Sequence, residues 1–198
     1  MRSLSFCLTV LFILSAIVRP LSAEEEPPEI SDPYLTNWQL GGDYMEQGRW
    51  EDAIDAYQRH IEELPKAVAA RIYMGNAYEE LGQKEKAYQL YRDAASIYPD
   101  IAMTYLRSEP GPNPVIADLL CDFGIQHAEV GDAFEAFGFF ADAVSVYPDH
   151  VEAHFRLGAA LLELGEKEYA IDEYGTLKRL DGEKAAELQL LIAESLSQ

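Results

Sequence analysis

The chain has 198 residues, of which 15 are Lys or Arg and 35 are Asp or Glu, so its formal net charge is −20 at pH 7. Hydrophobic residues make up 48 %, which is typical of a packed domain and excludes a disordered or low-complexity chain. So acidic a protein repels phosphate backbones and anionic headgroups, which argues against nucleic acids and anionic lipids as partners. Two cysteines are too few for a disulfide framework or a zinc site.

Residues 1–23 have the three-part pattern of an export signal. Arg2 precedes an apolar run over 6–18, and small residues up to Ala23 predict cleavage after that position. The run is shorter than the ~20 residues that a membrane-spanning helix needs. We therefore expect an exported protein, periplasmic or secreted, and the alternative is a membrane anchor formed by an uncleaved N-terminal segment. Residues 24–33 are acidic and rich in proline, and we interpret them as an exposed linker.

The rest of the chain repeats itself with a period of 34 residues. DAASIYPD at 93–100 returns as DAVSVYPD at 142–149, and the alignment gives four units at 34–67, 68–101, 117–150 and 151–183. Small residues and one aromatic ring keep fixed positions in these units. They are glycine at the eighth position (Gly41, Gly75, Gly124, Gly158), glycine at the fifteenth (Gly48, Gly82, Gly131, Gly165), alanine at the twentieth (Ala53, Ala87, Ala136, Ala170) and a following aromatic residue (Tyr57, Tyr91, Phe140, Tyr174).

This pattern resembles the tetratricopeptide repeat, which has the same period. The resemblance covers residues 34 to about 183 and implies an all-α fold, a right-handed superhelical solenoid of antiparallel helix pairs with a C-terminal capping helix. The glycine at the fifteenth position is expected to end the first helix of each pair, and Pro65, Pro99 and Pro148 to end the second. The usual early Trp is absent from all four units, which leaves the register unchanged.

Residues 102–116 interrupt the array between its second and third units. The part 102–107 can prolong a helix, whereas the prolines and glycine within 109–114 exclude regular structure. Such an insertion is either a projecting loop that shapes one rim of the groove or a tolerated surface addition, and both interpretations stay open.

The capping helix is expected over 184–198. One stripe of this helix is expected to face inward, and its residues are Ala185, Leu188, Ile192 and Leu196. Leu190 and Leu191 fall outside that stripe, and a homodimer through this helix is therefore an open alternative.

No catalytic constellation can be found in the sequence. It contains no phosphate-binding glycine loop, nucleophile elbow, calcium loop or metalloprotease helix. His150 and His154 form the one suggestive cluster, and ordinary solvated histidines explain it better than a metal site. Cys121 has no convincing basic neighbour and is expected to be a buried small residue. We therefore expect no enzyme activity, no metal site and no cofactor.

The resemblance implies that the first helix of each pair lines a concave groove, with ligand contacts at its fifth, ninth, twelfth and thirteenth positions. The candidate partner-binding residues on this basis are Trp38, Met45, Glu46, Ile72, Asn76, Glu79, Glu80, Cys121, Ile125, Glu129, Phe155, Leu162 and Glu163. The thirteenth position is a glutamate in every unit, and we call Glu46, Glu80, Glu129 and Glu163 the glutamate row. These positions contain no Lys or Arg, so the expected groove is apolar with an acidic row.

Such a groove predicts a protein or peptide partner that is apolar and carries Lys or Arg. The expected function is a non-enzymatic protein–protein interaction scaffold that aids assembly of a cell-envelope or secretion complex. The alternative is a structural, self-associating envelope or matrix component. Three plainer interpretations also stand. The glutamates are exposed helix formers, the overall acidity is a solubility or high-salt adaptation, and Trp38 and Phe155 are core residues between neighbouring helices.

Overall fold

The structure is a computed structural model that describes residues 36–109 and 111–196. Within these residues it contains ten α-helices and no strand, which confirms the all-α solenoid of antiparallel helix pairs. The expected signal over 1–23 and the linker over 24–33 lie outside the described residues. None of the described helices is long and apolar enough to cross a membrane.

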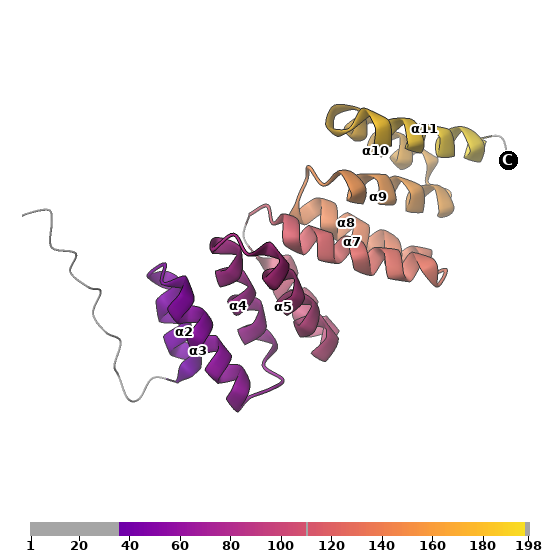
Figure 1. Ribbon diagram of the computed structural model, residues 1–198. Helices are drawn as coiled ribbons and strands as arrows, with labels where there is room; N and C mark the ends of the chain where they lie inside the picture. Colours follow the sequence, from indigo (N-terminus) through magenta and orange to yellow (C-terminus); the bar gives the residue numbers. More distant parts are fainter. Residues whose placement is uncertain (1–35, 110, 197–198) are drawn as a thin grey trace, which may run out of the picture. The chain divides into compact units, whose positions relative to one another are not determined.

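Eight of the described helices form four consecutive pairs (Figure 1). They are α2 (Asn37–Glu46) with α3 (Trp50–Glu63), α4 (Val68–Glu80) with α5 (Lys84–Ile97), α7 (Pro114–Glu129) with α8 (Ala133–Val146), and α9 (Val151–Glu163) with α10 (Lys167–Leu180). The helix α6 (Pro99–Ser108) lies between the second and third pairs in the chain, and α11 (Gly182–Leu196) follows the fourth.

The turn inside each pair depends on the glycine at the fifteenth position, as the sequence predicts. All four glycines have positive φ, from 70° to 84°, a conformation that side chains with a Cβ rarely adopt. Each glycine N–H donates to a carbonyl three residues earlier, as Gly82 does to Glu79 at 2.8 Å. These hydrogen bonds satisfy carbonyl groups that the helix end would otherwise leave unpaired.

The glycine at the eighth position lets an aromatic ring of the second helix lie directly on the backbone of the first. A Cβ added to Gly75 would come within 2.4 Å of the Tyr91 ring, and Gly41 and Gly124 stand in the same relation to Tyr57 and Phe140. These three rings are buried. Side chains of this size bury 150–250 Å² each, so the contact is a main source of hydrophobic stabilisation in the first three pairs.

The fourth pair departs from this arrangement. A Cβ added to Gly158 would meet Leu188 of α11 instead of the aromatic ring of Tyr174, which is only half-buried. The capping helix therefore takes the place that the ring has in the other pairs. Leu188 is buried as expected, but Leu196, which the sequence predicts to face inward, is exposed at the last position of α11.

The insertion forms a helix of its own. Tyr98 ends α5 and also begins α6, so Pro99 occupies the first turn of a new helix as well as following the old one. Ala102, Met103 and Leu106 are buried, which makes α6 part of the core. The next helix already starts at Pro114, where the Asn113 side chain accepts a hydrogen bond from the Ile116 N–H at 2.9 Å and caps it.

A single inserted helix reverses the direction of the pairs that follow. The start of α7 meets the end of α4, since Asn113 donates to Glu79 at 2.6 Å. Further along α7, Asp122 lies 2.5 Å from the Tyr88 hydroxyl of α5, so α7 runs in the same direction as α5. Because α5 is antiparallel to α4, α7 is antiparallel to α4 as well (Figure 1). The first helices of the third and fourth pairs therefore run opposite to those of the first and second.

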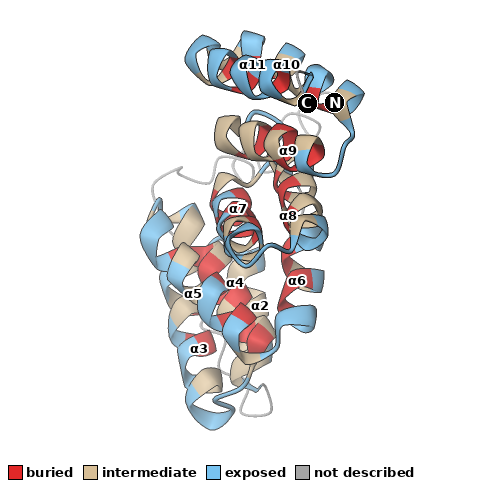
Figure 2. Ribbon diagram, turned by 90° about the vertical axis from the view of Figure 1, so that its right-hand side faces the viewer, coloured by how far each residue is buried: buried red, intermediate tan, exposed pale blue. Residues whose placement is uncertain are grey.

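The ends of these helices consequently fall on two different edges of the array. We call the side where α2 and α4 end the first edge. The helices α7 and α9 begin on this side, and His150 at the start of α9 lies 2.9 Å from Asp118 in the second turn of α7. The opposite side, where α7 and α9 end, is the second edge. Figure 2 shows that the buried residues lie where the helices face one another and that the exposed residues cover their outer faces.

The packing of rings on glycines predicts opposite effects of one substitution at two sites. Gly75→Ala forces a methyl group against Tyr91, whereas a Cβ at Gly138 within α8 would meet nothing within 4 Å. Over-packing costs roughly 1–3 kcal/mol and better helix propensity returns up to about 1 kcal/mol, so Gly75→Ala should lower the free energy of unfolding by about 1–2 kcal/mol. Gly138→Ala should raise it by about 0.5–1 kcal/mol in urea denaturation followed by circular dichroism. Equal effects of the two changes would contradict this packing role.

Candidate functional site

A pocket of about 480 Å³ lies on the first edge, where the ends of α2 and α4 meet the insertion. We call it the acidic pocket, and it is lined by Met45, Trp50, Asn76, Glu79, Glu80, Glu109, Pro112, Asn113 and Pro114. It brings together four of the candidate groove residues, Met45, Asn76, Glu79 and Glu80. Residues from the insertion form its other wall, so the insertion does shape a rim of this hollow.

The polar side chains of the acidic pocket are held by a hydrogen-bond network. The Tyr91 hydroxyl lies 2.5 Å from Glu79 Oε2 and 2.7 Å from Asn76 Oδ1. Asn113 Nδ2 donates to the same Glu79 oxygen at 2.6 Å. One buried tyrosine and one helix cap therefore fix the Glu79 carboxylate in place, which preorganises the site.

The acidic pocket concentrates negative charge. Burial raises the pKa of Glu109, and the nearby Glu79 carboxylate raises it further, while a hydrogen bond from Asn76 acts in the opposite direction. Glu80 is exposed at the same site, and no Lys or Arg belongs to the lining. Three carboxylates beside the apolar surfaces of Met45 and two prolines favour a cationic group with an apolar stem.

The glutamate row does not form one continuous line. Its four members are all exposed, and each is the last residue of its helix. Because the inserted helix reverses the later pairs, Glu46 and Glu80 lie on the first edge and Glu129 and Glu163 on the second. The sequence places them at equivalent positions, but the structure separates them into two pairs.

Among the other candidate groove residues, Ile72 and Cys121 present no free surface, and Trp38 is half-buried beside a pocket of about 320 Å³. Ile72 and Cys121 are buried, and burial raises the pKa of the Cys121 thiol to about 12. Trp38 packs between helices, with its ring centre 5.6 Å from that of Tyr57 and 5.5 Å from that of Tyr73. The packing interpretation of this tryptophan therefore fits the structure.

Among the remaining candidate residues, Phe155 is covered by a lysine side chain, whereas Leu162 and Glu163 line a pocket. Lys184 Nζ lies 4.5 Å from the centre of the Phe155 ring, so a cation of the chain itself already covers this ring. Ile125 and Leu162 are half-buried. Leu162 and Glu163 line a smaller pocket of about 390 Å³ between α9, α10 and α11.

The two clustered histidines have separate partners. His150 Nε2 lies 2.9 Å from Asp118, and the buried His154 has Nδ1 2.5 Å from Glu173 and Nε2 2.8 Å from the Pro148 carbonyl. Within residues 36–109 and 111–196, no group of three or more His, Cys, Asp or Glu side chains is arranged to hold a metal ion.

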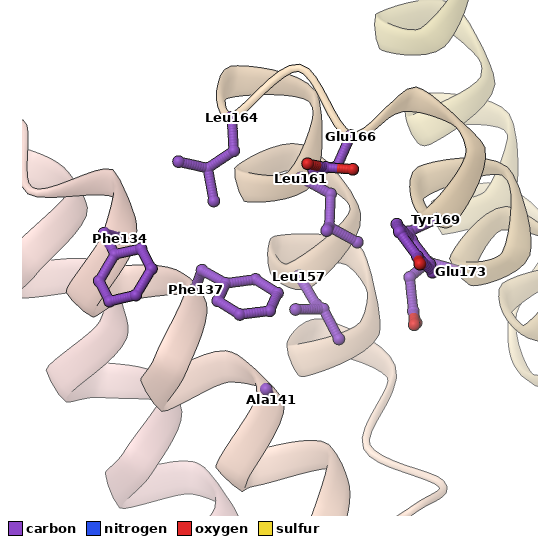
Figure 3. A pocket seen from close by; sticks show the side chains of 9 residues that line it. All are labelled: Phe134, Phe137, Ala141, Leu157, Leu161, Leu164, Glu166, Tyr169 and Glu173. Atoms are coloured by element: carbon purple, nitrogen blue, oxygen red, sulfur yellow. The ribbon is translucent and has the colours of Figure 1, made fainter.

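The sequence analysis missed a second hollow, which lies between α8, α9 and α10. This apolar pocket of about 630 Å³ is lined by Phe134, Phe137, Ala141, Leu157, Leu161, Leu164, Glu166, Tyr169 and Glu173 (Figure 3). Each helix contributes residues that look like ordinary core positions in the sequence. Only Phe134 and Tyr169, which depart from the apolar stripes of their helices, could have drawn attention to it.

Comparison with known proteins identifies the repeats. A family model of the tetratricopeptide repeat matches residues 39–100 and 128–190, on either side of α6 and most of α7. A search of the curated proteins finds no match.

Several solved structures are similar to this chain. The MamA protein has 17 % sequence identity and a TM-score of 0.38, with 81 % of this chain and 85 % of that chain covered. A tetratricopeptide repeat protein from Parabacteroides merdae has 15 % identity and a TM-score of 0.43, with 81 % and 59 % covered. A thermophilic protein of this kind from Thermus thermophilus has 20 % identity and a TM-score of 0.36, with 81 % and 85 % covered.

The surroundings of His154 predict a pH-dependent contribution to stability. Burial lowers the pKa of His154, but the hydrogen bonds to Glu173 and to the Pro148 carbonyl outweigh it and raise this pKa above 6.5, because both acceptors favour the doubly protonated ring. The contribution is complete below pH 6.5, the unfolded value, and is lost as the pH rises through the folded pKa. The free energy of unfolding should therefore fall as the pH rises above 6.5.

Urea titrations at several pH values measure this slope. His154→Gln should flatten it and lower the stability at pH 6 by about 1.5–3 kcal/mol, the range for a hydrogen bond to a charged group. His127→Gln, at a half-exposed ring 3.6 Å from Asp132, is the control and should leave the slope in place. A slope that persists in His154→Gln would show that other groups cause it.

Proposed function

The chain belongs to the tetratricopeptide repeat family, and from this premise we propose that it is a non-enzymatic scaffold that binds an apolar and basic segment of another polypeptide at the acidic pocket. The fold of this family supports protein–protein interaction in general, and its members are generally scaffolds without catalytic activity. The particular ligand chemistry is our proposal. It is carried by one observation: three carboxylates and no cation line a pocket with apolar walls.

The energetics of the pocket favour a cationic ligand group. Burial raises the pKa of Glu109, and the charge of the Glu79 carboxylate beside it raises this pKa further. A Lys or Arg side chain placed between them would offset this repulsion. Its aliphatic stem could pack on Met45, Trp50 and Pro112, which supply apolar surface beside the charges.

The helix ends add to this preference. Glu46 and Glu80 sit at the C-terminal ends of α2 and α4, and neither helix has a basic residue in its last turn. A negative charge at a C-terminus opposes the helix dipole by about 0.3–1 kcal/mol. A ligand cation at the first edge would interact favourably with both the helix dipoles and the carboxylates. Glutamates at these positions therefore destabilise the free protein slightly but favour the binding of a cation.

We further propose that the scaffold acts outside the cytosol, in the periplasm or as a secreted protein, and helps to assemble an envelope or secretion complex. The support is the pattern of residues 1–23, with Arg2 before an apolar run and small residues at its end. An uncleaved segment that anchors the protein in a membrane is the alternative.

A charge reversal at Glu80 should weaken binding of a basic peptide. The probe is a labelled 15-residue peptide of Leu and Lys, compared with its Leu and Glu counterpart, in fluorescence anisotropy with the full chain. We expect only the Lys peptide to bind, with an affinity that falls as salt rises. Glu80→Lys should weaken it about tenfold, since about 1.4 kcal/mol corresponds to this factor.

Glu62→Lys is the matched control for this experiment. Glu62 is also an exposed glutamate in the last turn of a helix, and it lies outside the acidic pocket. The change in net charge is therefore identical, and we expect less than a twofold effect. Equal weakening by both variants would reduce the result to overall charge, and equal binding of the Glu peptide would refute the proposed ligand.

A self-associating structural component is the second candidate function, because α11 exposes large apolar side chains. Leu190 is 67 %, Leu191 36 % and Leu196 64 % exposed. A surface of this kind can pair with that of a second copy.

The self-association hypothesis has its own test. If α11 pairs with that of another copy, light scattering after size exclusion should show a mass that grows with concentration. Leu190→Ser with Leu191→Ser should return it to the monomer value. A constant monomer mass of the unchanged chain would exclude this candidate.

A further inference from the structure

The apolar pocket between α8, α9 and α10 exposes large side chains to water. Phe134 is 71 % and Tyr169 61 % exposed, and Leu164 is partly exposed between them. Val130, which directly precedes the turn into α8, is exposed as well. Phe134, Leu164 and Tyr169 line the same pocket, and contiguous exposed apolar surface usually marks an interaction site.

The floor of the pocket is shaped to receive apolar side chains. Leu157 and Leu161 of α9 are buried at its base, and Figure 3 shows Phe137 pointing toward them from α8. The volume of about 630 Å³ lies within the range of small-molecule sites and accommodates more than one side chain. Glu173 at its margin is already engaged by His154 at 2.5 Å, so the interior demands no polar partner.

The frame of the pocket is strongly acidic. The two turns that border it, 131–135 and 163–168, contain five carboxylates and one Lys. That residue, Lys167, donates to the Ser195 carbonyl and is directed at α11. A second copy of this chain carries the same net charge of −20, so electrostatics opposes self-pairing here and favours a partner with Lys or Arg around its apolar residues.

The position of this pocket separates it from the acidic pocket. Leu164 and Glu166 lie at the end of α9 and the start of α10, and Phe134 lies in the first turn of α8. These helix ends belong to the second edge, because the single helix α6 reverses the later pairs. The two pockets share no residue and lie on different edges.

We propose that the apolar pocket is a second docking site, which takes two apolar anchor side chains of a polypeptide segment flanked by Lys or Arg. The protein thereby holds two segments at once, one on each edge of the array. Phe134 and Tyr169 clasp the anchors, Leu157 and Leu161 form the floor, and the surrounding carboxylates set the orientation of the flanking cations. Docking at the apolar pocket does not depend on the function proposed above, whereas the simultaneous binding of two segments rests on it.

Selection from a library of random 12-residue peptides displayed on phage tests the proposal. The full chain is the bait, and no ligand sequence is assumed. We expect one group of selected peptides with two apolar residues one helical turn apart and flanking Lys or Arg. Phe134→Ser with Tyr169→Ser should weaken this group at least tenfold, while Glu80→Lys should change its affinity less than twofold.

Matched controls keep the result interpretable. Phe134 and Tyr169 are exposed, so their replacement should leave the thermal unfolding of the chain nearly unchanged. Leu190→Ser with Leu196→Ser removes two similarly exposed apolar residues from α11 and should not change the affinity of the peptides that bind the apolar pocket. A labelled peptide that depends on Glu80 should still bind, with less than a twofold change, when the apolar pocket is saturated.

Other outcomes would overturn the proposal. In the first, no selected peptides depend on Phe134 and Tyr169 for binding. In the second, the peptides that do depend on these residues lack Lys and Arg. In the third, peptides for the two pockets compete with one another. A concentration-dependent dimer abolished by Phe134→Ser with Tyr169→Ser would identify a second copy as the occupant instead. Binding that appears only after removal of residues 1–35 would assign the pocket to the chain's own N-terminal segment.

Discussion

Each of the first three helix pairs is held together by an aromatic ring that lies on a glycine of the partner helix. The Tyr91 ring reaches the backbone of α4 only because Gly75 has no Cβ, and the pair can then bury its apolar sides at close distance. A single pair exposes its remaining apolar face, so the pairs stack on one another and the array becomes stable as a whole. In the fourth pair Leu188 of α11 supplies this contact, which makes the capping helix part of the packing.

The direction of the array depends on the number of helices inserted into it. An inserted pair would preserve the direction of the units that follow, whereas the single helix α6 reverses it. The hydrogen bond from Asn113 to Glu79 marks the point where the reversed part begins. This link also completes the acidic pocket, so one insertion both changes the direction of the array and builds one of its hollows.

Charge and apolar surface are combined differently in the two pockets. In the acidic pocket the carboxylates line the hollow itself, and Glu79 is fixed by Tyr91 and Asn113. In the apolar pocket the carboxylates surround a floor of leucines, and Glu173, which is hydrogen-bonded to the buried His154, lies at the margin. The acidic pocket thus selects first for charge and the apolar pocket first for apolar shape, while the overall acidity favours basic partners at both.

The sequence by itself determined the helix pairs, their turns and their apolar faces. The turn in each pair needs a glycine with positive φ, such as Gly82, and the close ring contact needs a residue without a Cβ, such as Gly75. Both requirements are local, and they recur with the period of the repeat. The sequence also placed Met45, Asn76, Glu79 and Glu80 among the candidate groove residues, and the structure brings these four together. Only the tertiary structure decided that Glu80 and Glu129 lie on different edges, that Leu188 replaces an aromatic ring and that Phe134 and Tyr169 frame a pocket. These features depend on the direction in which distant helices pack, and a residue's position within its own repeat contains no information about that direction.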